Sequence, residues 1–147
     1  MFEKVLIATD GSDESVEAAK VASQYIEQGL TKELLVLNIE PTFVAGTIDM
    51  GMTVGNVENW NSMAQEYGKN IIEETCRNIK GEATITKKVI MGDPASSICE
   101  CAENNDCELI IMGSRGNSQL KGLLLGSVST KVLHYAKCPV LVVKAKK

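Results

Sequence analysis

Five short runs of apolar and β-branched residues, separated by segments with helical spacing, constrain the fold of this chain more than any other feature. Runs of this length, bounded by turn residues, are typical of β-strands. The first two suit strands buried on both faces of a parallel sheet, whereas the third alternates apolar and polar residues and suits a sheet edge. The predicted strands are Lys4–Thr9, Glu33–Ile39, Ala83–Ile90, Glu108–Met112 and Pro139–Lys144.

The segments between these runs carry the signals of four helices. Ser12 or Asp13 is expected to cap the first helix and Ser127 the fourth. Asp93 is expected to cap the third helix, because a proline follows it at the first helical position. The predicted helices run from Asp13 to about Gln28, from about Val57 to Lys80, from Pro94 to about Asn104, and from Ser127 to Tyr135 or Ala136. The period of the second includes Trp60 and Tyr67, and the inner faces of the third and fourth include Ile98, Cys101, Ala102, Val128, Val132 and Leu133.

Strands that alternate with helices along the whole chain predict parallel βαβ units joined by right-handed crossovers. The expected fold class is therefore α/β: an open, doubly wound, Rossmann-like sheet of five parallel strands in the order 3-2-1-4-5, with helices on both faces. A length of 147 residues is typical of one domain, which we expect to span residues 1–147. The segment from Thr42 to Asn59 lacks a sustained period and is predicted to be a loop, with a lid, a partner site and a connection without function as open alternatives.

Charge and hydropathy narrow the class of protein. The net charge of -4 and the pI near 5.1 argue against broad affinity for nucleic acid or anionic lipid. No apolar run approaches the roughly 20 residues that a membrane helix needs. Glu3 and Lys4 lead directly into a core-like run where a secretory signal would have its own charged and apolar regions, so the cytoplasm is the expected location.

The five cysteines are odd in number and have no CxxC spacing, which favours neither a disulfide framework nor a zinc ribbon. Cys99, Cys101 and Cys107 are close in sequence and would be the candidates for a metal or redox site. The sole histidine, His134, is distant from them in sequence, and cysteine is commonly a small buried hydrophobe. We therefore expect reduced, buried thiols and no metal site.

The stretch from Ile110 to Val128 has the pattern of a strand, a glycine loop and a helix. It is apolar up to Gly113 and carries further glycines before a helical pattern returns at Ser127. Glycine lets another group come close to the backbone, and the start of a helix presents unpaired amide hydrogens to an anion. The stretch therefore predicts a phosphate site.

In an open α/β sheet, ligands bind beyond the carboxyl ends of the strands, near the point where the strand order reverses. Three segments are expected to meet there: Ala8 to Ser12, Asn38 to Pro41 and Met112 to Val128. In this arrangement Asp10, next to Ala8 and Thr9, can accept hydrogen bonds from ribose hydroxyls. The main chain at Ile39 can contact an adenine edge.

Several nucleotide and phosphate motifs are absent from the sequence. The turn after the first strand contains Asp10, Gly11 and Ser12 and has no GxGxxG, which argues against a dinucleotide of the NAD type. No GxxxxGK[ST] occurs, so the P-loop lysine and magnesium ligand are missing. A phosphate-accepting receiver domain would need an acid after its third strand. Asp93 follows that strand but precedes a proline, which favours a helix cap.

The spacing of the glycines in this loop is a more specific signal than a lone pair of glycines. Gly113 and Gly116 are followed by nine residues and then by Gly126 and Ser127, a pattern written GxxG, nine residues, G[ST]. This pattern resembles the nucleotide-binding signature of the universal stress protein family. The resemblance covers essentially the whole chain, through VLIATDGS, the GDP turn, IIMGSRG, LLGSVS and CPVLVVK.

The resemblance implies a ligand and a set of site residues. The ligand would be ATP, or ADP or AMP, with Mg²⁺. Asp10 matches the acid on the ribose side, and Ile39 matches the position that contacts adenine. The phosphate loop and its flanking contacts would be Met112, Gly113, Arg115, Gly116, Gly126, Ser127 and Val128. Family members typically form homodimers by pairing their last strands, which correspond here to Val140, Leu141, Val142 and Val143.

A nucleotide-binding regulatory or stress-response module is the expected function. The sequence offers no recognisable pair of a water-activating base and an arginine finger, on which phosphoryl transfer depends. A slow ATPase or phosphotransferase is one alternative, and a dimeric interaction module indifferent to nucleotide is another. For Arg115, phosphate neutralisation and simple solvation stay equally open.

Overall fold

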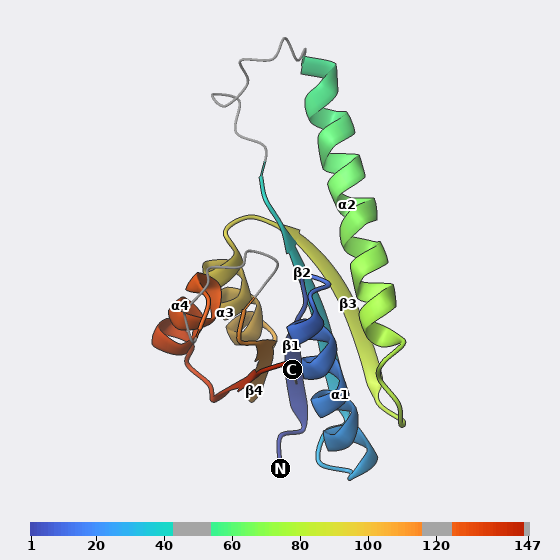
Figure 1. Cartoon of the computed structure of the whole chain (residues 1–147), viewed down its shortest axis with the longest axis vertical. Coiled ribbons are helices and arrows are strands. Elements are labelled where there is room, and N and C mark those ends of the chain that lie inside the picture. Colours follow the sequence, from blue (N-terminus) through green and yellow to red (C-terminus); the bar gives the residue numbers. More distant parts are fainter. Residues whose placement is uncertain (43–53, 116–124, 146–147) are drawn as a thin grey trace.

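The computed structural model describes residues 1–42, 54–115 and 125–145, with the backbone alone for residues 54–57. Strands and helices alternate along the chain (Figure 1). The strands are β1 (Lys4–Ala8), β2 (Glu33–Glu40), β3 (Thr84–Met91), β4 (Leu109–Gly113) and β5 (Val140–Val143). The helices are α1 (Asp13–Glu27), α2 (Val54–Cys76), α3 (Pro94–Asn104) and α4 (Ser127–Tyr135). None of these helices in the described part of the chain is long and apolar enough to cross a membrane.

The five strands form one parallel sheet in the order β3-β2-β1-β4-β5, which confirms the predicted order. β1 lies in the middle, where Val5 pairs with Leu34 on one side and Leu109 on the other. The third strand lies at an edge as predicted, and none of its residues is fully buried. The strand order reverses between β1 and β4, so a ligand site is expected beyond the ends of these two strands.

Helices cover both faces of the sheet (Figure 1). On one face Leu6 and Leu37 pack with α3 and α4 in an apolar cluster, and on the other Val5 and Val36 pack with α1 and α2. The predicted inner face of α3 is confirmed, because Ile98, Cys101 and Ala102 are all buried in the first cluster. Burial of apolar side chains on two faces is what stabilises a sheet of this kind.

The helix starts follow the predicted capping pattern at α1 and α3 but not at α4. Ser12 accepts a hydrogen bond from the amide of Ser15 at 3.3 Å, and Asp93 accepts one from the amide of Ser96 at 3.1 Å. That bond to the Ser96 amide lowers the pKa of Asp93. α4 has Gly126 as its N-cap with no side-chain cap bond, so the prediction that Ser127 caps this helix is wrong. The Gly126 amide is instead bonded to the backbone carbonyl of Ser114, and that carbonyl also accepts from the Ser129 hydroxyl, which fixes the helix start without a side-chain cap.

The predicted bounds of α2 are wrong at both ends. The helix begins at Val54 and ends at Cys76, so residues 54–59 of the predicted loop are helical, and residues 43–53 lie outside the described part. Residues 58–63 are all exposed, so the first turns have no buried face from which apolar periodicity could locate a start. At the other end, hydrogen bonds from Asn78 to Thr75 and from Ile79 to Cys76 form a tight turn in place of further helix.

Some side chains that fit a helical period are exposed. Trp60 is 40% exposed, and Figure 1 shows the first turns of α2 extending past the ends of the strands. Tyr67 is 57% exposed and Leu133 is 44% exposed, so the predicted burial of Leu133 is wrong, whereas Val132 is fully buried. A helical period identifies a helix, but it does not reveal where the sheet beneath that helix ends.

Gly68 allows α2 to lie close to the sheet, and this position supplies a test of the fold. A Cβ atom there would lie 2.6 Å from Asn38 Oδ1 and 2.6 Å from Val89 Cγ1. Gly→Ala in an exposed helix stabilises by about 1 kcal/mol. We expect Gly68→Ala to destabilise by about 1–3 kcal/mol instead, because α2 must move away from β2 and β3. Urea unfolding measures the difference, with Ser62→Ala on the exposed side of α2 as the control. Equal or greater stability of Gly68→Ala would contradict this packing.

Candidate functional site

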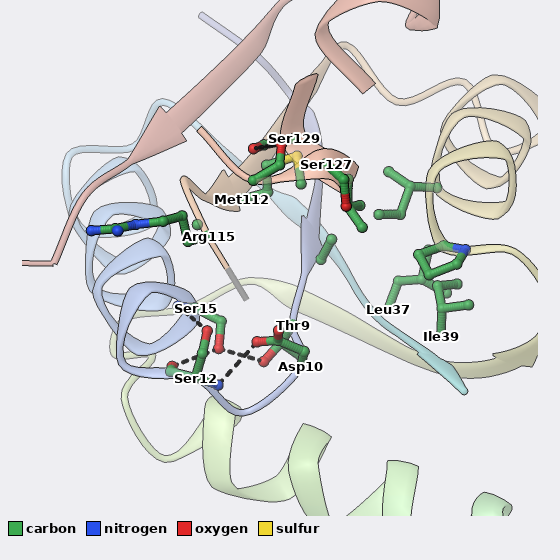
Figure 2. A pocket seen from close by; sticks show the side chains of 16 residues that line it. Thr9, Asp10, Ser12, Ser15, Leu37, Ile39, Met112, Arg115, Ser127 and Ser129 are labelled. Carbon is green, nitrogen blue, oxygen red and sulfur yellow. Dashed lines mark hydrogen bonds between the residues drawn. The ribbon is translucent and has the colours of Figure 1, made fainter. Parts of the chain in front are cut away.

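A cavity of about 190 Å³ lies at the carboxyl ends of β1, β2 and β4, where the strand order reverses (Figure 2). Helices α1, α3 and α4 contribute residues from their first turns. The residues that line the cavity are Ala8, Thr9, Asp10, Ser12, Ser15, Leu37, Ile39, Pro94, Ile98, Met112, Gly113, Arg115, Gly126, Ser127, Val128 and Ser129. This is the position in which open α/β sheets bind ligands.

The cavity has an apolar side and a polar side. Leu37 and Ile39 of β2 lie on one side of the view in Figure 2, and Thr9, Asp10 and the serines of α1 lie on another. Ile98 of α3 and Val128 of α4 also line the cavity. Ile98 is a buried member of the apolar cluster, and Val128 packs against that cluster. An apolar slot beside a few fixed polar groups suits a flat, partly polar ligand.

The turn after β1 holds the Asp10 carboxylate in place. The amide of Ser12 donates to Asp10 Oδ1 at 3.0 Å, and the amide of Gly11 donates to Thr9 Oγ1 at 3.3 Å. Gly11 has a φ of 82°, in the left-handed region that favours glycine. The turn therefore runs directly into the start of α1, with Asp10 on the cavity wall.

The two ends of the glycine loop are tied together at its base. The carbonyl of Ser114 accepts hydrogen bonds from the Gly126 amide at 2.7 Å and from Ser129 Oγ at 2.8 Å. The amide of Ser114 donates to the Val143 carbonyl at 2.7 Å, which joins this residue to β5 as well. The end of β4 and the start of α4 are thereby fixed side by side, with Arg115 next to them.

Gly113 and Gly126 differ in whether packing leaves room for a side chain. A Cβ atom on Gly113 would lie 2.6 Å from Glu14 Cβ and 3.0 Å from the Glu14 carbonyl carbon, so α1 and β4 pack too closely for a side chain. Gly126 has an extended backbone with a φ of -74°, and the nearest atoms to a Cβ there are 3.4 Å away. The described fold therefore requires glycine at position 113 but not at position 126.

The cavity lies beside the starts of helices and has few formal charges. The first turns of α1 and α4 border it, and first-turn amides, which have no partner within their own helix, give each helix start a partial positive charge. Arg115 adds a full positive charge, and Asp10 is the one carboxylate among the described lining residues. An anion bound near α4 would meet favourable electrostatics.

All the predicted site residues that the structure describes line this cavity. They are Ala8, Thr9, Asp10, Ile39, Met112, Gly113, Arg115, Gly126, Ser127 and Val128. Gly116 lies outside the described residues. The structure adds Ser12, Ser15, Leu37, Pro94, Ile98 and Ser129, which the prediction did not name as site residues. The capping signals at Ser12 and Asp93 would have drawn attention to the first turns of α1 and α3.

Comparison with known proteins identifies the family. The family model described as "Universal stress protein family" matches residues 1–144. The chain belongs to the universal stress protein family. Universal stress protein MJ0531 of Methanocaldococcus jannaschii is 33% identical over 150 residues, with 100% of this chain and 85% of that protein covered. Universal stress protein YxiE of Bacillus subtilis is 33% identical, with 98% of this chain and 100% of that protein covered.

Solved structures share the universal stress protein fold. The structure of MJ0577, a protein of Methanocaldococcus jannaschii, has a TM-score of 0.85 at 28% identity and covers 100% of this chain and 99% of its own. A universal stress protein in complex with cAMP has a TM-score of 0.66 at 24% identity, with 99% and 98% covered. A family protein of Arabidopsis thaliana with AMP bound has a TM-score of 0.61 at 19% identity, with 98% and 92% covered.

The cysteines lie away from the cavity. All five are free thiols, and Cys99, Cys101, Cys107 and Cys138 pack in or against the cluster beneath α3 and α4. Burial raises the pKa of each of these thiols, and that of Cys107 to about 11. Across residues 1–42, 54–115 and 125–145, no three His, Cys, Asp or Glu side chains are grouped to hold a metal ion. The raised pKa values favour the unreactive thiol form.

Gly113 and Gly126 supply a matched test of how the site is packed. We expect Gly113→Ala to destabilise by about 1–3 kcal/mol, because its Cβ meets Glu14, including the Glu14 backbone. We expect Gly126→Ala to cost about 1 kcal/mol or less, since its backbone is extended and the cost is confined to the N-cap preference. Urea unfolding of both variants measures the two values. Equal costs would contradict the separate roles of these glycines.

Proposed function

We propose that the cavity binds an adenine nucleotide, ATP or its products ADP and AMP, and that the protein is a nucleotide-dependent regulatory module of the stress response. The observation that carries the proposal is the juxtaposition of the fixed Asp10 carboxylate, the apolar slot and the start of α4 around one cavity. Family membership supports it, and two proteins of the same fold were solved with cAMP and with AMP.

Each part of the nucleotide has a matching part of the cavity. The base fits the slot beside Leu37 and Ile39, where its faces would meet apolar side chains. The ribose hydroxyls would donate to Asp10, whose carboxylate is oriented by the Ser12 amide. The phosphates would lie between Arg115 and the first amides of α4.

The oxygen ligands on the cavity wall fit Mg²⁺ only when phosphate oxygens complete its coordination. Magnesium requires oxygen ligands in octahedral geometry and commonly keeps one or two carboxylates plus phosphate oxygens. Asp10 is the one carboxylate on the described cavity wall, and it also faces the expected ribose position. The ion would therefore arrive bound to the nucleotide phosphates.

The described wall also offers no second carboxylate or histidine that could act as a general base in hydrolysis. This supports a protein that holds ATP over one that turns it over efficiently.

Nucleotide binding can be tested by calorimetry with ATP and Mg²⁺. We expect the parent protein to bind ATP and Asp10→Ala to bind at least roughly tenfold more weakly, because a charge-assisted hydrogen bond contributes about 1.5–3 kcal/mol. Asp13→Ala, an exposed acid three residues on in the first turn of α1, is the matched control and keeps the parent affinity. Absence of binding at millimolar ATP would leave a nucleotide-indifferent interaction module as the better account.

We also propose that the protein forms a homodimer through β5. This strand is at the edge of the sheet and consists of Val140, Leu141, Val142 and Val143, all half-buried. The carbonyls of Pro139 and Val143 accept hydrogen bonds from the β4 side. Because backbone groups alternate in direction along a strand, those of Val140 and Val142 point away from β4 toward the open edge. An apolar edge of this kind favours pairing with a second strand.

A backbone substitution tests this dimer. Val142→Pro removes an amide on the open edge while leaving the hydrogen bonds to β4, so we expect a monomer in light scattering with a folded circular dichroism spectrum. Val142→Thr keeps the amide and the branched shape, and we expect it to remain dimeric. A monomeric parent protein, or a dimeric Val142→Pro, would refute pairing through β5.

A further inference from the structure

Three buried hydroxyl groups lie in a row beneath the Asp10 turn. Thr9 Oγ1 is 2.8 Å from Thr75 Oγ1 and 3.1 Å from Ser15 Oγ, and the bond between Thr9 and Ser15 is drawn in Figure 2. Thr9, Ser15 and Thr75 are 5%, 2% and 2% exposed. They lie directly after β1, at the start of α1 and in the last turn of α2. The row therefore connects three elements of the chain at one point.

The hydrogen atoms of this row restrict its arrangement, because a hydroxyl group donates only one. Ser15 donates to the Ser12 carbonyl at 2.8 Å, so it accepts from Thr9. When Thr9 donates to Ser15, the bond between the two threonines must be donated by Thr75. When Thr75 donates instead to the Ile71 carbonyl, at 2.8 Å, Thr9 turns its hydrogen to Thr75 and Ser15 loses a donor. Only the first order gives both Thr9 and Ser15 a donor from within the row, and in that order the Thr75 hydrogen is not donated to the Ile71 carbonyl.

α2 also lies close to the turn. The Ile71 side chain lies 3.5 Å from the position that a Cβ atom on Gly11 would occupy. A second, more open cleft on this side is lined by Asp10, Gly11, Ile71 and Thr75 among others. Asp10 lines both this cleft and the main cavity, so the turn lies between the candidate nucleotide site and α2.

We infer that Thr75 is a positioning residue of the nucleotide site, although it does not line the cavity. Its hydroxyl fixes Thr9 Oγ1, which holds the Gly11 amide on one side and Ser15 on the other, and thereby fixes the turn that presents Asp10. The inference deepens the proposed function and rests on it for the ligand. Through this bond between Thr75 and Thr9, the position of α2 and the geometry at Asp10 depend energetically on each other.

The experiment compares Thr75→Val, which keeps the shape and removes the hydroxyl, with Thr75→Ser, which restores it. Amide hydrogen exchange at Gly11 and Ser12 is measured by NMR without ligand, and the Kd for ATP with Mg²⁺ is measured by calorimetry. We expect Thr75→Val to speed exchange of both amides and to raise the Kd, each by roughly tenfold, since one buried hydrogen bond is lost. Thr75→Ser is expected to return both to near the parent values.

Ser23→Ala is the matched control. Ser23 is 5% exposed and its hydroxyl bonds to the backbone of Lys80 near the other end of α1, at 2.7 Å from the Lys80 amide. The Ser23→Ala variant should have a lower Tm, but its amide exchange at Gly11 and Ser12 and its ATP affinity should be unchanged. If Thr75→Val fails to fold, Thr75→Ala provides the same loss of hydroxyl with less bulk.

Three results would overturn the inference. They are unchanged exchange at Gly11 and Ser12 in Thr75→Val, unchanged ATP affinity despite faster exchange, and equal weakening of ATP binding by Ser23→Ala. Failure of the parent protein to bind ATP would instead refute the proposed function, and exchange at the turn would still decide whether Thr75 positions it.

Discussion

The backbone of Ser114 is the point on which the candidate site depends. Its amide bonds to the Val143 carbonyl, and its carbonyl accepts from both the Gly126 amide and the Ser129 hydroxyl. One residue thus joins the end of β4 to β5 and to the start of α4. Such bonds are expensive to leave unmade in a buried position, and Ser114 and Ser129 are each only 2% exposed. The position of the first turn of α4 relative to the ends of β4 and β5 is therefore set by the fold before any ligand arrives, which is what preorganisation requires.

Glycines of one motif can exist for different reasons. Gly113 is required because the start of α1 packs on the end of β4, a constraint of the empty protein. Gly126 meets no comparable obstacle and has an extended backbone, so the fold alone does not explain why a side chain is missing there. A phosphate group approaching the start of α4 would explain it, since a Cβ atom would occupy space close to the first amides. The proposed nucleotide binding would thus account for the part of the motif that packing leaves unexplained.

The sequence predicted all the strands and helices, and it was least accurate at the two ends of α2. Apolar runs identified all five strands, and the alternation in the third placed it near an edge, whereas the order of the strands was predicted with the doubly wound fold class. The start of α2 was predicted at about Val57 in place of Val54, because residues 58–63 are exposed and no buried face marks the first turns. Ser15 and Ser129 were missed because their hydroxyls bond to residues outside their own helices, Thr9 and Ser114, which helical patterns do not encode. Their relation to the cavity appears only when helices and strands meet.

The side of the sheet beneath α1 and α2 changes character along the strands. Val5, Val36 and their neighbours are apolar, whereas Asn38, Thr9 and Thr75 make a polar layer at the carboxyl ends. Asn38 donates to the Thr9 carbonyl, but its Oδ1 has no hydrogen-bond partner in the described residues, at a cost of about 1–3 kcal/mol. An apolar layer would be more stable, and the polar one coincides with the edge that holds Asp10. Functional regions are commonly less stable than the rest of a protein, because a ligand site needs fixed polar groups. Here the compromise is confined to the end of the sheet that faces the cavity, and the apolar remainder of the core supports it.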